Sequence, residues 1–351
     1  MAGAALRSLI TALALLMTYL LFWPVAIEPL AWHPATAPAL EGVYERNDAL
    51  AAAVAVGEGM APGPEDIAFD QDGVLYTGLG DGSIVRVDVN TGLVERYAET
   101  GGRPAGMKFD AAGNLIVADV FRGLLSVRAD GGVQVLVDQI AGRPLHFAND
   151  LDIGSDGVVY FSESSAKFAA GSGTDGLMAH TGDGALHAYN SKTGELVTIL
   201  DGLTYANGVA LNADESAIYV AELGSYRVHR VWLRGDDAGK HEIFLDNLPG
   251  FPDNLNTGPD DTLWVALGIP RMKLLDALAP YPFVRKILAR LPMPSGFERQ
   301  AIALQVDKNG KVIRNLQDPD PAHPLLTSVY ERDGVLYMGN LFGTAVYRLP
   351  L

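Results

Sequence analysis

Apolar positions follow two different patterns along the chain. Between Ser8 and Ile27 no side chain is charged, and Leu, Ala, Ile, Met, Phe and Trp predominate. An apolar run of that length is typical of a helix that crosses a bilayer. From residue 40 onward, short apolar runs alternate with turns rich in Asp, Gly and Asn. Such turns followed by apolar runs are typical of β-hairpins.

The N-terminal apolar run is flanked by Arg7 and Glu28. A positive charge before the run favours a cytoplasmic N-terminus, which would place the chain after residue 28 on the extracytoplasmic side, periplasmic or lumenal. The alternative is a cleaved signal peptide, whose apolar region is about 7–15 residues long and is followed by small residues. This run is longer and ends in Phe22-Trp23-Pro24. We therefore interpret residues 1–28 as a single-pass transmembrane anchor and residues 29–39 as a linker.

One unit recurs six times in the rest of the chain. Each copy is a turn followed by an apolar strand that ends in a large side chain, as in Asp72–Tyr76, Asp156–Tyr160 and Asp333–Tyr337. In most copies a second alternating strand follows within a few residues. Repeats of this size and content predict an all-β fold, a six-bladed β-propeller, over residues 40–351.

One segment of the fifth repeat departs from the β pattern. Its apolar residues recur at helical spacing, and they are Leu274, Leu275, Leu278, Val284, Ile287, Leu288 and Leu291. This spacing predicts a helical insertion in blade five over about residues 270–300. Basic residues outnumber acidic ones there. We interpret residues 272–291 either as an element that contacts membrane lipid or as a packed lid with a solvated basic face.

Charge and composition exclude several classes of protein. The chain has 26 Lys and Arg against 42 Asp and Glu, a formal net charge of −16, so a nucleic-acid partner is not expected. It has no Cys, which excludes disulfides, zinc–thiolate sites and iron–sulfur clusters. With 48% hydrophobic and 19% charged residues, the chain is too apolar to be disordered. These properties leave the oligomeric state open.

Equivalent positions in the repeats carry side chains with oxygen atoms. In four of the six copies, an Asp, Asn or Glu lies at, or next to, the position eleven residues before the large residue that ends the repeat strand. These residues, with one direct neighbour, are Glu65, Asn149, Asn207, Asp253 and Asn254. The other two positions are Ala105 and Leu326, which would leave room for a substrate. If the positions begin the innermost strands, these oxygens converge on the propeller axis.

Carboxylate and amide oxygens without His or Cys are the ligands that a hard cation such as Ca²⁺ prefers. The alternative is that each Asn or Asp forms a local turn with its own backbone. We favour a metal site, because oxygens crowded on an axis need a cation or a complete hydrogen-bond network.

Several segments together resemble a known family. They are Gly63–Phe69, Gly102–Pro104, Ala118–Asp119, Phe147–Leu151, Tyr160–Ser165, Ala206–Val209 and Leu248–Asn254. The chain resembles the strictosidine-synthase-like proteins, including the adipocyte plasma-membrane-associated group, which are related to paraoxonases and to senescence marker protein/gluconolactonase. The resemblance implies one axial calcium ion on the five residues named above. It also implies a second, structural calcium ion at Asp66 and Asp150.

The sequence departs from its relatives in two places. The histidine pair proposed as the general base in paraoxonases has no clear counterpart, because the second repeat reads Pro104-Ala105-Gly106. The first-blade disulfide of relatives is impossible without Cys. True strictosidine synthases use no metal and deprotonate an amine with a glutamate, so a retained ligand set favours the hydrolases.

The sequence therefore predicts a membrane-anchored, calcium-dependent hydrolase of lactones or of aryl or carboxylic esters. Ca²⁺ would polarise the carbonyl group for attack by water. Candidate catalytic residues are His146, three residues before Asn149, as the base, and Glu163. His146 has the alternative of a structural hydrogen bond, and Glu163 that of a supporting residue. Two other functions stay open: a non-catalytic, calcium-stabilised binding module and a strictosidine-synthase-like lyase.

Overall fold

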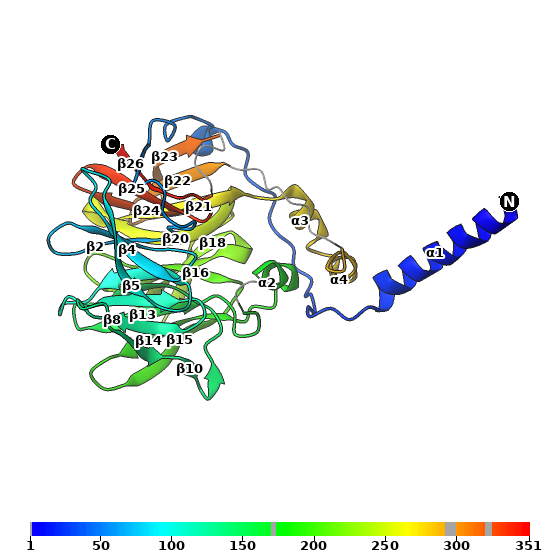
Figure 1. Cartoon of the computed structure of the whole chain (residues 1–351). Helices are drawn as coiled ribbons and strands as arrows, with labels where there is room; N and C mark the ends of the chain where they lie inside the picture. Colours follow the sequence, from blue (N-terminus) through cyan, green and yellow to red (C-terminus); the bar gives the residue numbers. More distant parts are fainter. Residues whose placement is uncertain (1, 170–172, 292–299, 320–324) are drawn as a thin grey trace.

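The strands of this protein form a ring of sheets (Figure 1). In the computed structural model, which describes residues 2–169, 173–291, 300–319 and 325–351, there are six four-stranded antiparallel sheets. Each innermost strand contacts the innermost strand of the next sheet, from β2 through β6, β12, β16 and β20 to β24, and β2 contacts β25 of the last sheet. The predicted six-bladed β-propeller is confirmed.

The sheets follow one another along the chain. The first contains β2 (Ile67–Phe69), β3 (Leu75–Gly78), β4 (Ser83–Val87) and β5 (Val94–Glu99), and the second β6 (Pro104–Phe109), β7 (Leu115–Asp119), β8 (Gly123–Val127) and β9 (Val133–Val137). The third contains β12 (Ala148–Ile153), β13 (Val158–Glu163), β14 (Gly184–Asn190) and β15 (Glu195–Leu203), and the fourth β16 (Ala206–Leu211), β17 (Ala217–Glu222), β18 (Arg227–Trp232) and β19 (His241–Leu245). The fifth contains β20 (Gly250–Gly258), β21 (Thr262–Pro270), β22 (Ala301–Val306) and β23 (Val312–Asp318).

The sixth sheet joins the two ends of the propeller. It contains β24 (Leu326–Arg332), β25 (Val335–Asn340) and β26 (Val346–Pro350), and its outer strand is β1 (Val54–Val56), which pairs with β26. A separate hairpin is formed by β10 (Gln139–Ile140) and β11 (Arg143–Pro144), and short 3₁₀ turns lie at Gly42–Tyr44, Leu223–Ser225 and Pro259–Asp261. Strand pairing between β1 and β26 therefore closes the ring in a chain that has no Cys.

The repeated turns have a local cause. The Asp70 carboxylate accepts hydrogen bonds from the backbone N–H groups of Asp72 (3.0 Å) and Val74 (2.8 Å). Asp110 does the same for Ala112 (2.9 Å) and Asn114 (2.8 Å) in the second sheet. Such side-chain hydrogen bonds stabilise the turn between the first two strands of a blade.

Helices gather at one end of the propeller (Figure 1). α1 (Ala2–Phe22) projects away from the sheets and is long and apolar enough, over Gly3–Phe22, to cross a membrane. α2 (Gly173–Ala179) lies between β13 and β14, and α3 (Lys273–Leu278) and α4 (Pro282–Leu288) lie between β21 and β22. Residues 292–299 of the predicted insertion lie outside the described residues.

The segment after α1 packs on these helices. The backbone N–H of Leu30 donates to the carbonyl of Ala179 (2.9 Å), and the ring of Trp32 stacks on His180 with centroids 4.0 Å apart. Arg271 Nη2 donates to the carbonyl of Ala35 (2.7 Å). The segment that we predicted as a linker is thus held against the propeller along much of its length.

Candidate functional site

Five predicted ligands lie at the start of the innermost strands. Asn149 belongs to β12, Asn207 to β16, and Asp253 and Asn254 to β20, while Glu65 immediately precedes Asp66 and β2. All five side chains are buried. We call Glu65, Asn149, Asn207, Asp253 and Asn254 the axial oxygen cluster.

A β-bulge places the cluster. The pairing register shifts between Ala148 and Leu151 in β12, and β16 and β20 have register shifts at the matching place. A bulge inserts an extra residue and re-aims the side chains next to it. Consecutive polar residues of one strand, such as Asn149 and Asp150, can therefore both lie near the axis instead of alternating between faces.

Two of the three amide groups in the cluster, those of Asn149 and Asn207, are oriented by hydrogen bonds, whereas Asn254 Nδ2 is buried without a partner among the described residues. Asn149 Nδ2 donates to Ser164 Oγ (3.0 Å), and that hydroxyl donates to the carbonyl of Ala206 (2.7 Å). The side chain of Asn207 is hydrogen-bonded to Asp253. Within the described part of the chain, the Oδ1 atoms of Asn149, Asn207 and Asn254 are buried and have no hydrogen-bond partner. Because unpartnered buried oxygens are costly, this donor set fits a bound cation.

The charge of the cluster also fits a cation. Burial, and then the neighbouring Glu65 carboxylate, raise the pKa of Asp253 well above its ordinary value, although the hydrogen bond from Asn207 opposes this. Only two of the five side chains are carboxylates, and the described residues contain no cluster of three or more His, Cys, Asp or Glu arranged to hold a metal. The metal-binding role of the cluster remains a prediction.

Arg103 is a site residue that we did not predict. Its Nη2 atom lies 2.5 Å from Glu65 Oε2, and its backbone N–H donates to Asp119 Oδ1 (3.1 Å). The only signal for it in the sequence was its place in Gly102–Pro104, one of the segments that carry the family resemblance. Arg103 brings a fixed positive charge to a predicted calcium ligand.

Apolar side chains pack beside the charged residues of the site. Tyr205 packs on the buried cluster of Ala105, Val120 and Phe147, and its ring centroid lies 5.6 Å from that of Phe147 in an edge-to-face arrangement. Burial and the carboxylates of Asp253 and Glu65 raise the pKa of the Tyr205 phenol. The site therefore combines oxygen ligands with an apolar surface suited to the organic part of a small molecule.

Asp66 and Asp150 have a different role from the cluster. Asp66 Oδ2 accepts the backbone N–H of Met107 (3.0 Å), and Asp150 Oδ2 accepts that of Val209 (2.7 Å). Each carboxylate thus links its strand to the innermost strand of the next sheet. Burial raises the pKa of Asp66 to about 6, and the Lys108 ammonium opposes that shift. Burial, and then the Asp66 carboxylate, raise the pKa of Asp150 well above its ordinary value, although backbone N–H groups and the Lys108 ammonium oppose this. The second calcium ion at Asp66 and Asp150 stays a prediction.

Glu163 is buried in an ion-pair network. Arg143 Nη1 and Nη2 each lie 2.6 Å from its carboxylate oxygens, and His187 Nε2 lies at 3.4 Å. Burial acts to raise the pKa of Glu163, but hydrogen bonds from Arg143 and His187 lower it overall. In the next sheet Glu222 has the same kind of partners, Arg227 (2.5 Å) and His229 (2.8 Å).

This repetition favours a structural role for Glu163, in which its carboxylate holds the loop that carries His146. The backbone N–H of His146 donates to Glu163 Oε1 (3.4 Å), and the His146 side chain is half-buried just before β12. The catalytic roles of His146 and Glu163 both remain predictions.

The chain is similar to known proteins in sequence and in fold. Residues 42–87 match the family described as "Strictosidine synthase-like, N-terminal", and residues 149–236 match "Strictosidine synthase". The adipocyte plasma membrane-associated protein of Rattus norvegicus is 32% identical over 352 residues, which cover 93% of this chain and 93% of that protein.

Two solved structures share the fold. A gluconolactonase from Xanthomonas campestris has a TM-score of 0.62 at 18% identity and covers 84% of this chain and 88% of its own. Regucalcin from Agrobacterium tumefaciens, described as a calcium-binding protein, has a TM-score of 0.61 at 14% identity and covers 85% of this chain and 93% of its own. At this identity the two structures show a shared fold only.

Proposed function

Because the chain belongs to the strictosidine synthase-like family, we propose that it is a calcium-dependent hydrolase of lactones or of aryl or carboxylic esters. One observation carries the proposal: the buried, unpartnered Oδ1 atoms of Asn149, Asn207 and Asn254 beside the carboxylates of Glu65 and Asp253. The fold shared with a gluconolactonase and with a calcium-binding protein supports it.

The residues of the chain have distinct tasks in this proposal. Glu65 and Asp253 supply the negative charge, and the three amides supply neutral oxygens, for one calcium ion. When bound, Ca²⁺ supplies a Lewis acid for the substrate carbonyl. Tyr205 and Phe147 present an apolar surface to the organic part of the ester. His146 is the candidate to take a proton from the attacking water and return it to the leaving oxygen.

A second function is favoured by Arg103. Its guanidinium lies 2.5 Å from Glu65 Oε2 and neutralises one of the two carboxylates of the cluster without a metal. This supports a lyase of the strictosidine synthase type, which needs no metal and in which Arg103 or Glu65 contacts the ligand directly. The two functions differ in whether calcium competes with Arg103 for Glu65.

Metal analysis combined with hydrolysis assays distinguishes these functions. The full chain in detergent micelles is assayed on a panel of lactones and phenyl acetate, with calcium and with a chelator. Glu65→Gln tests the cluster, and Glu95→Gln, at an exposed ion pair with Arg86, is the matched control. We expect one bound calcium ion and hydrolysis that chelator and Glu65→Gln abolish. Bound calcium without hydrolysis would support the binding module, and absence of calcium would exclude the leading function.

We also propose a place for the protein in the cell. α1 fits a single-pass membrane protein, and the similarity to a protein named as plasma membrane-associated supports this. We place the N-terminus in the cytoplasm and the propeller on the extracytoplasmic side, periplasmic or lumenal, because Arg7 precedes the span.

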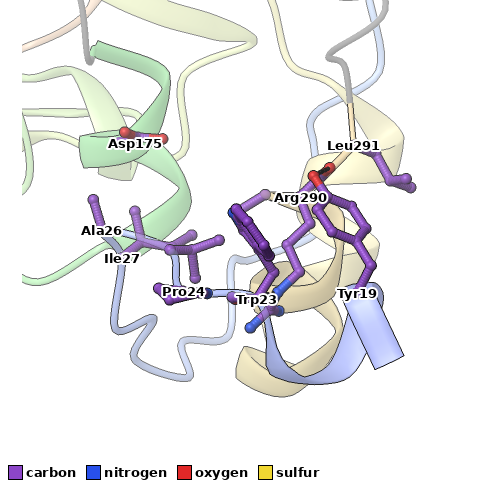
Figure 2. Close-up of a pocket in the computed structure, with 10 residues that line it drawn as sticks. Tyr19, Trp23, Pro24, Ala26, Ile27, Asp175, Arg290 and Leu291 are labelled. Carbon is purple, nitrogen blue, oxygen red and sulfur yellow. Dashed lines mark hydrogen bonds between the residues drawn. The ribbon is translucent and has the colours of Figure 1, made fainter. Parts of the chain in front are cut away.

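The α3–α4 segment is proposed to lie on the lipid surface. The side chains of Leu274, Tyr281 and Phe283 are 66%, 58% and 63% exposed. The chain just after α4 is also joined to the end of α1, because Tyr19 Oη donates to the carbonyl of Arg290 (2.8 Å) and Arg290 Nε donates to that of Trp23 (2.7 Å). Tyr19, Trp23 and Arg290 are among the residues that line a cavity of about 450 Å³, and Figure 2 shows their side chains. Apolar and aromatic side chains next to a membrane span suit the interface.

The absence of native Cys makes this placement testable. A fluorophore on Phe283→Cys, in the full chain in nanodiscs, is expected to be quenched by lipids that carry a nitroxide near the headgroup. The matched control is Ile313→Cys on β23, an exposed position that is distant in sequence from the helices. Equal quenching at both positions would contradict the lipid contact and favour a lid.

A further inference from the structure

The innermost strands carry a second set of polar residues, which follow the axial oxygen cluster along the strands. Each large residue that ends a repeat strand (Tyr76, Ile116, Tyr160, Tyr219, Trp264 or Tyr337) pairs in register with one residue of the innermost strand. These partners are Ala68, Lys108, Asp152, Ala210, Asn256 and Tyr330. They are structurally equivalent, so the polar members come from the second, third, fifth and sixth sheets. We call Lys108, Asp152, Asn256 and Tyr330 the lysine layer.

Lys108 reaches across the axis within this layer. Its Nζ atom lies 3.6 Å from Asp152 Oδ1 in the third sheet and 3.5 Å from Asn256 Oδ1 in the fifth. It also lies 5.8 Å from the ring centroid of Tyr330 in the sixth. One side chain from β6 therefore contacts three other sheets, which places its ammonium group close to the centre of the ring.

Ala68 and Asp152 occupy equivalent positions in β2 and β12. Asp66 and Asp150 stand two residues before them. Burial raises the pKa of both carboxylates, and the nearby Lys108 ammonium opposes that rise. Their oxygens accept backbone N–H groups of Met107, Leu151 and Val209. A divalent cation at the same place would face an ammonium group in a buried site, where like charges repel strongly.

We propose that the ammonium group of Lys108 takes the place of a second, structural cation, so that the propeller axis binds no more than one divalent ion. The side chain supplies one positive charge and three donors at a point where carboxylates from two sheets meet. Because the ammonium group is covalently attached, this part of the axis keeps one positive charge at any calcium concentration. Whether the axial oxygen cluster binds calcium or catalyses a reaction does not affect this assignment.

Calcium stoichiometry tests the assignment. The full chain in detergent micelles is stripped with a chelator and dialysed to equilibrium against radioactive calcium, and thermal unfolding is followed with calcium and with chelator. Lys108→Ala removes the ammonium group and opens space beside Asp66, Asp150 and Asp152. Lys108→Arg is the control that keeps the charge, and Lys108→Ala combined with Asp150→Asn removes the site that the first change opens.

We expect Lys108→Ala to bind one calcium ion more than the wild-type chain and to gain a calcium-dependent rise in its unfolding temperature. Lys108→Arg should match the wild type, and the double variant should lose the extra ion. The proposal is overturned if the wild-type chain binds two ions and Asp150→Asn removes one of them. It is also overturned if Lys108→Ala folds, by its circular dichroism, and binds no more calcium than the wild type.

Two controls separate this proposal from the proposed function. If Lys108→Ala does not fold, the comparison of wild type with Asp150→Asn still decides, because an unchanged stoichiometry is expected. A wild-type chain that binds no calcium would contradict the proposed function, while the gain of an ion in Lys108→Ala would still support the role of Lys108.

Discussion

The axial oxygen cluster and the lysine layer are built from similar residues on the same innermost strands, but they have opposite hydrogen-bond states. In the cluster, the Oδ1 atoms of Asn149, Asn207 and Asn254 have no partner among the described residues. In the layer, Lys108 pairs with the oxygens of Asp152 and Asn256. Only the cluster therefore offers oxygens to a ligand.

An Asp or Asn at an axial position is therefore not by itself a metal ligand. Asp150 and Asp253 are both buried carboxylates on innermost strands. Each has a carboxylate neighbour, Asp66 for Asp150 and Glu65 for Asp253, but Asp150 also accepts backbone N–H groups and lies near the Lys108 ammonium. The capacity to bind a cation is decided by what each oxygen already contacts.

The distinction between the cluster and other buried carboxylates fails if a carboxylate outside the cluster is catalytic, and Glu163 is the residue that decides this. Glu163→Gln and Glu222→Gln should each lower the free energy of unfolding by about 3 kcal/mol, because each leaves an arginine without its buried partner. Urea denaturation measures that loss. We expect hydrolysis per folded molecule to stay unchanged in both. Loss of hydrolysis in folded Glu163→Gln alone would instead make Glu163 catalytic.

A matched pair of aspartates tests the two regions directly. Asp253→Asn in the cluster should weaken calcium binding about 100-fold, since a calcium site tunes its affinity by the number of charged ligands. Asp152→Asn in the lysine layer should leave calcium affinity within about twofold, because its carboxylate is paired with Lys108. Isothermal titration calorimetry on the full chain compares them. Equal losses in both variants would remove the distinction.

Arg103 is predicted to compete with calcium for Glu65. Arg103→Met removes the cation that is paired with Glu65, so calcium should bind about tenfold more tightly. Arg96→Met, at an exposed position, serves as the control. Competition between calcium and a fluorescent chelator measures the change. Unchanged calcium affinity would show that Arg103 does not compete for Glu65, and would favour the metal-free function.

The smallest expected effect concerns how the free energy of unfolding depends on pH. His180, at the helical end of the propeller, and Asp66, near the axis, are expected to contribute with opposite signs. Burial lowers the pKa of His180, which stacks on Trp32, from 6.5 to about 4. The unfolded chain therefore binds this proton first, and the stability contributed by neutral His180 is lost as pH falls from about 6.5 toward 4. Between pH 7 and 5.5 the calcium-free wild type should lose about 1 kcal/mol more than His180→Gln.

Urea denaturation at the two pH values measures that difference. Asp66 acts with the opposite sign, because its folded-state pKa is raised to about 6 and protonation at lower pH favours the folded chain. Asp66 is present in both proteins, so its contribution cancels between wild type and variant. An identical pH dependence in the two would show that the contact between Trp32 and His180 does not respond to acid.

The propeller could be predicted from the sequence alone. Six copies of a turn and a strand specify six sheets, because the pattern is local and is repeated at each blade. The large residue at the end of each copy, such as Tyr76 or Tyr160, pairs in register with the innermost strand, so equivalent positions could be read from spacing. The apolar helix at the N-terminus was predicted from length and composition alone.

Which polar side chains already have a partner could be seen only in the folded structure. Arg103 contacts Glu65 from another sheet, Lys108 contacts Asp152 and Asn256 from two others, and residues 29–39 pack on helices distant in sequence. Spacing places Lys108, Asp152 and Asn256 at equivalent positions of their sheets, but it does not show that their side chains pair. A repeat fixes which positions face the axis, because backbone geometry is periodic. It does not fix which oxygen is already paired, because that depends on side chains that meet only when the ring closes.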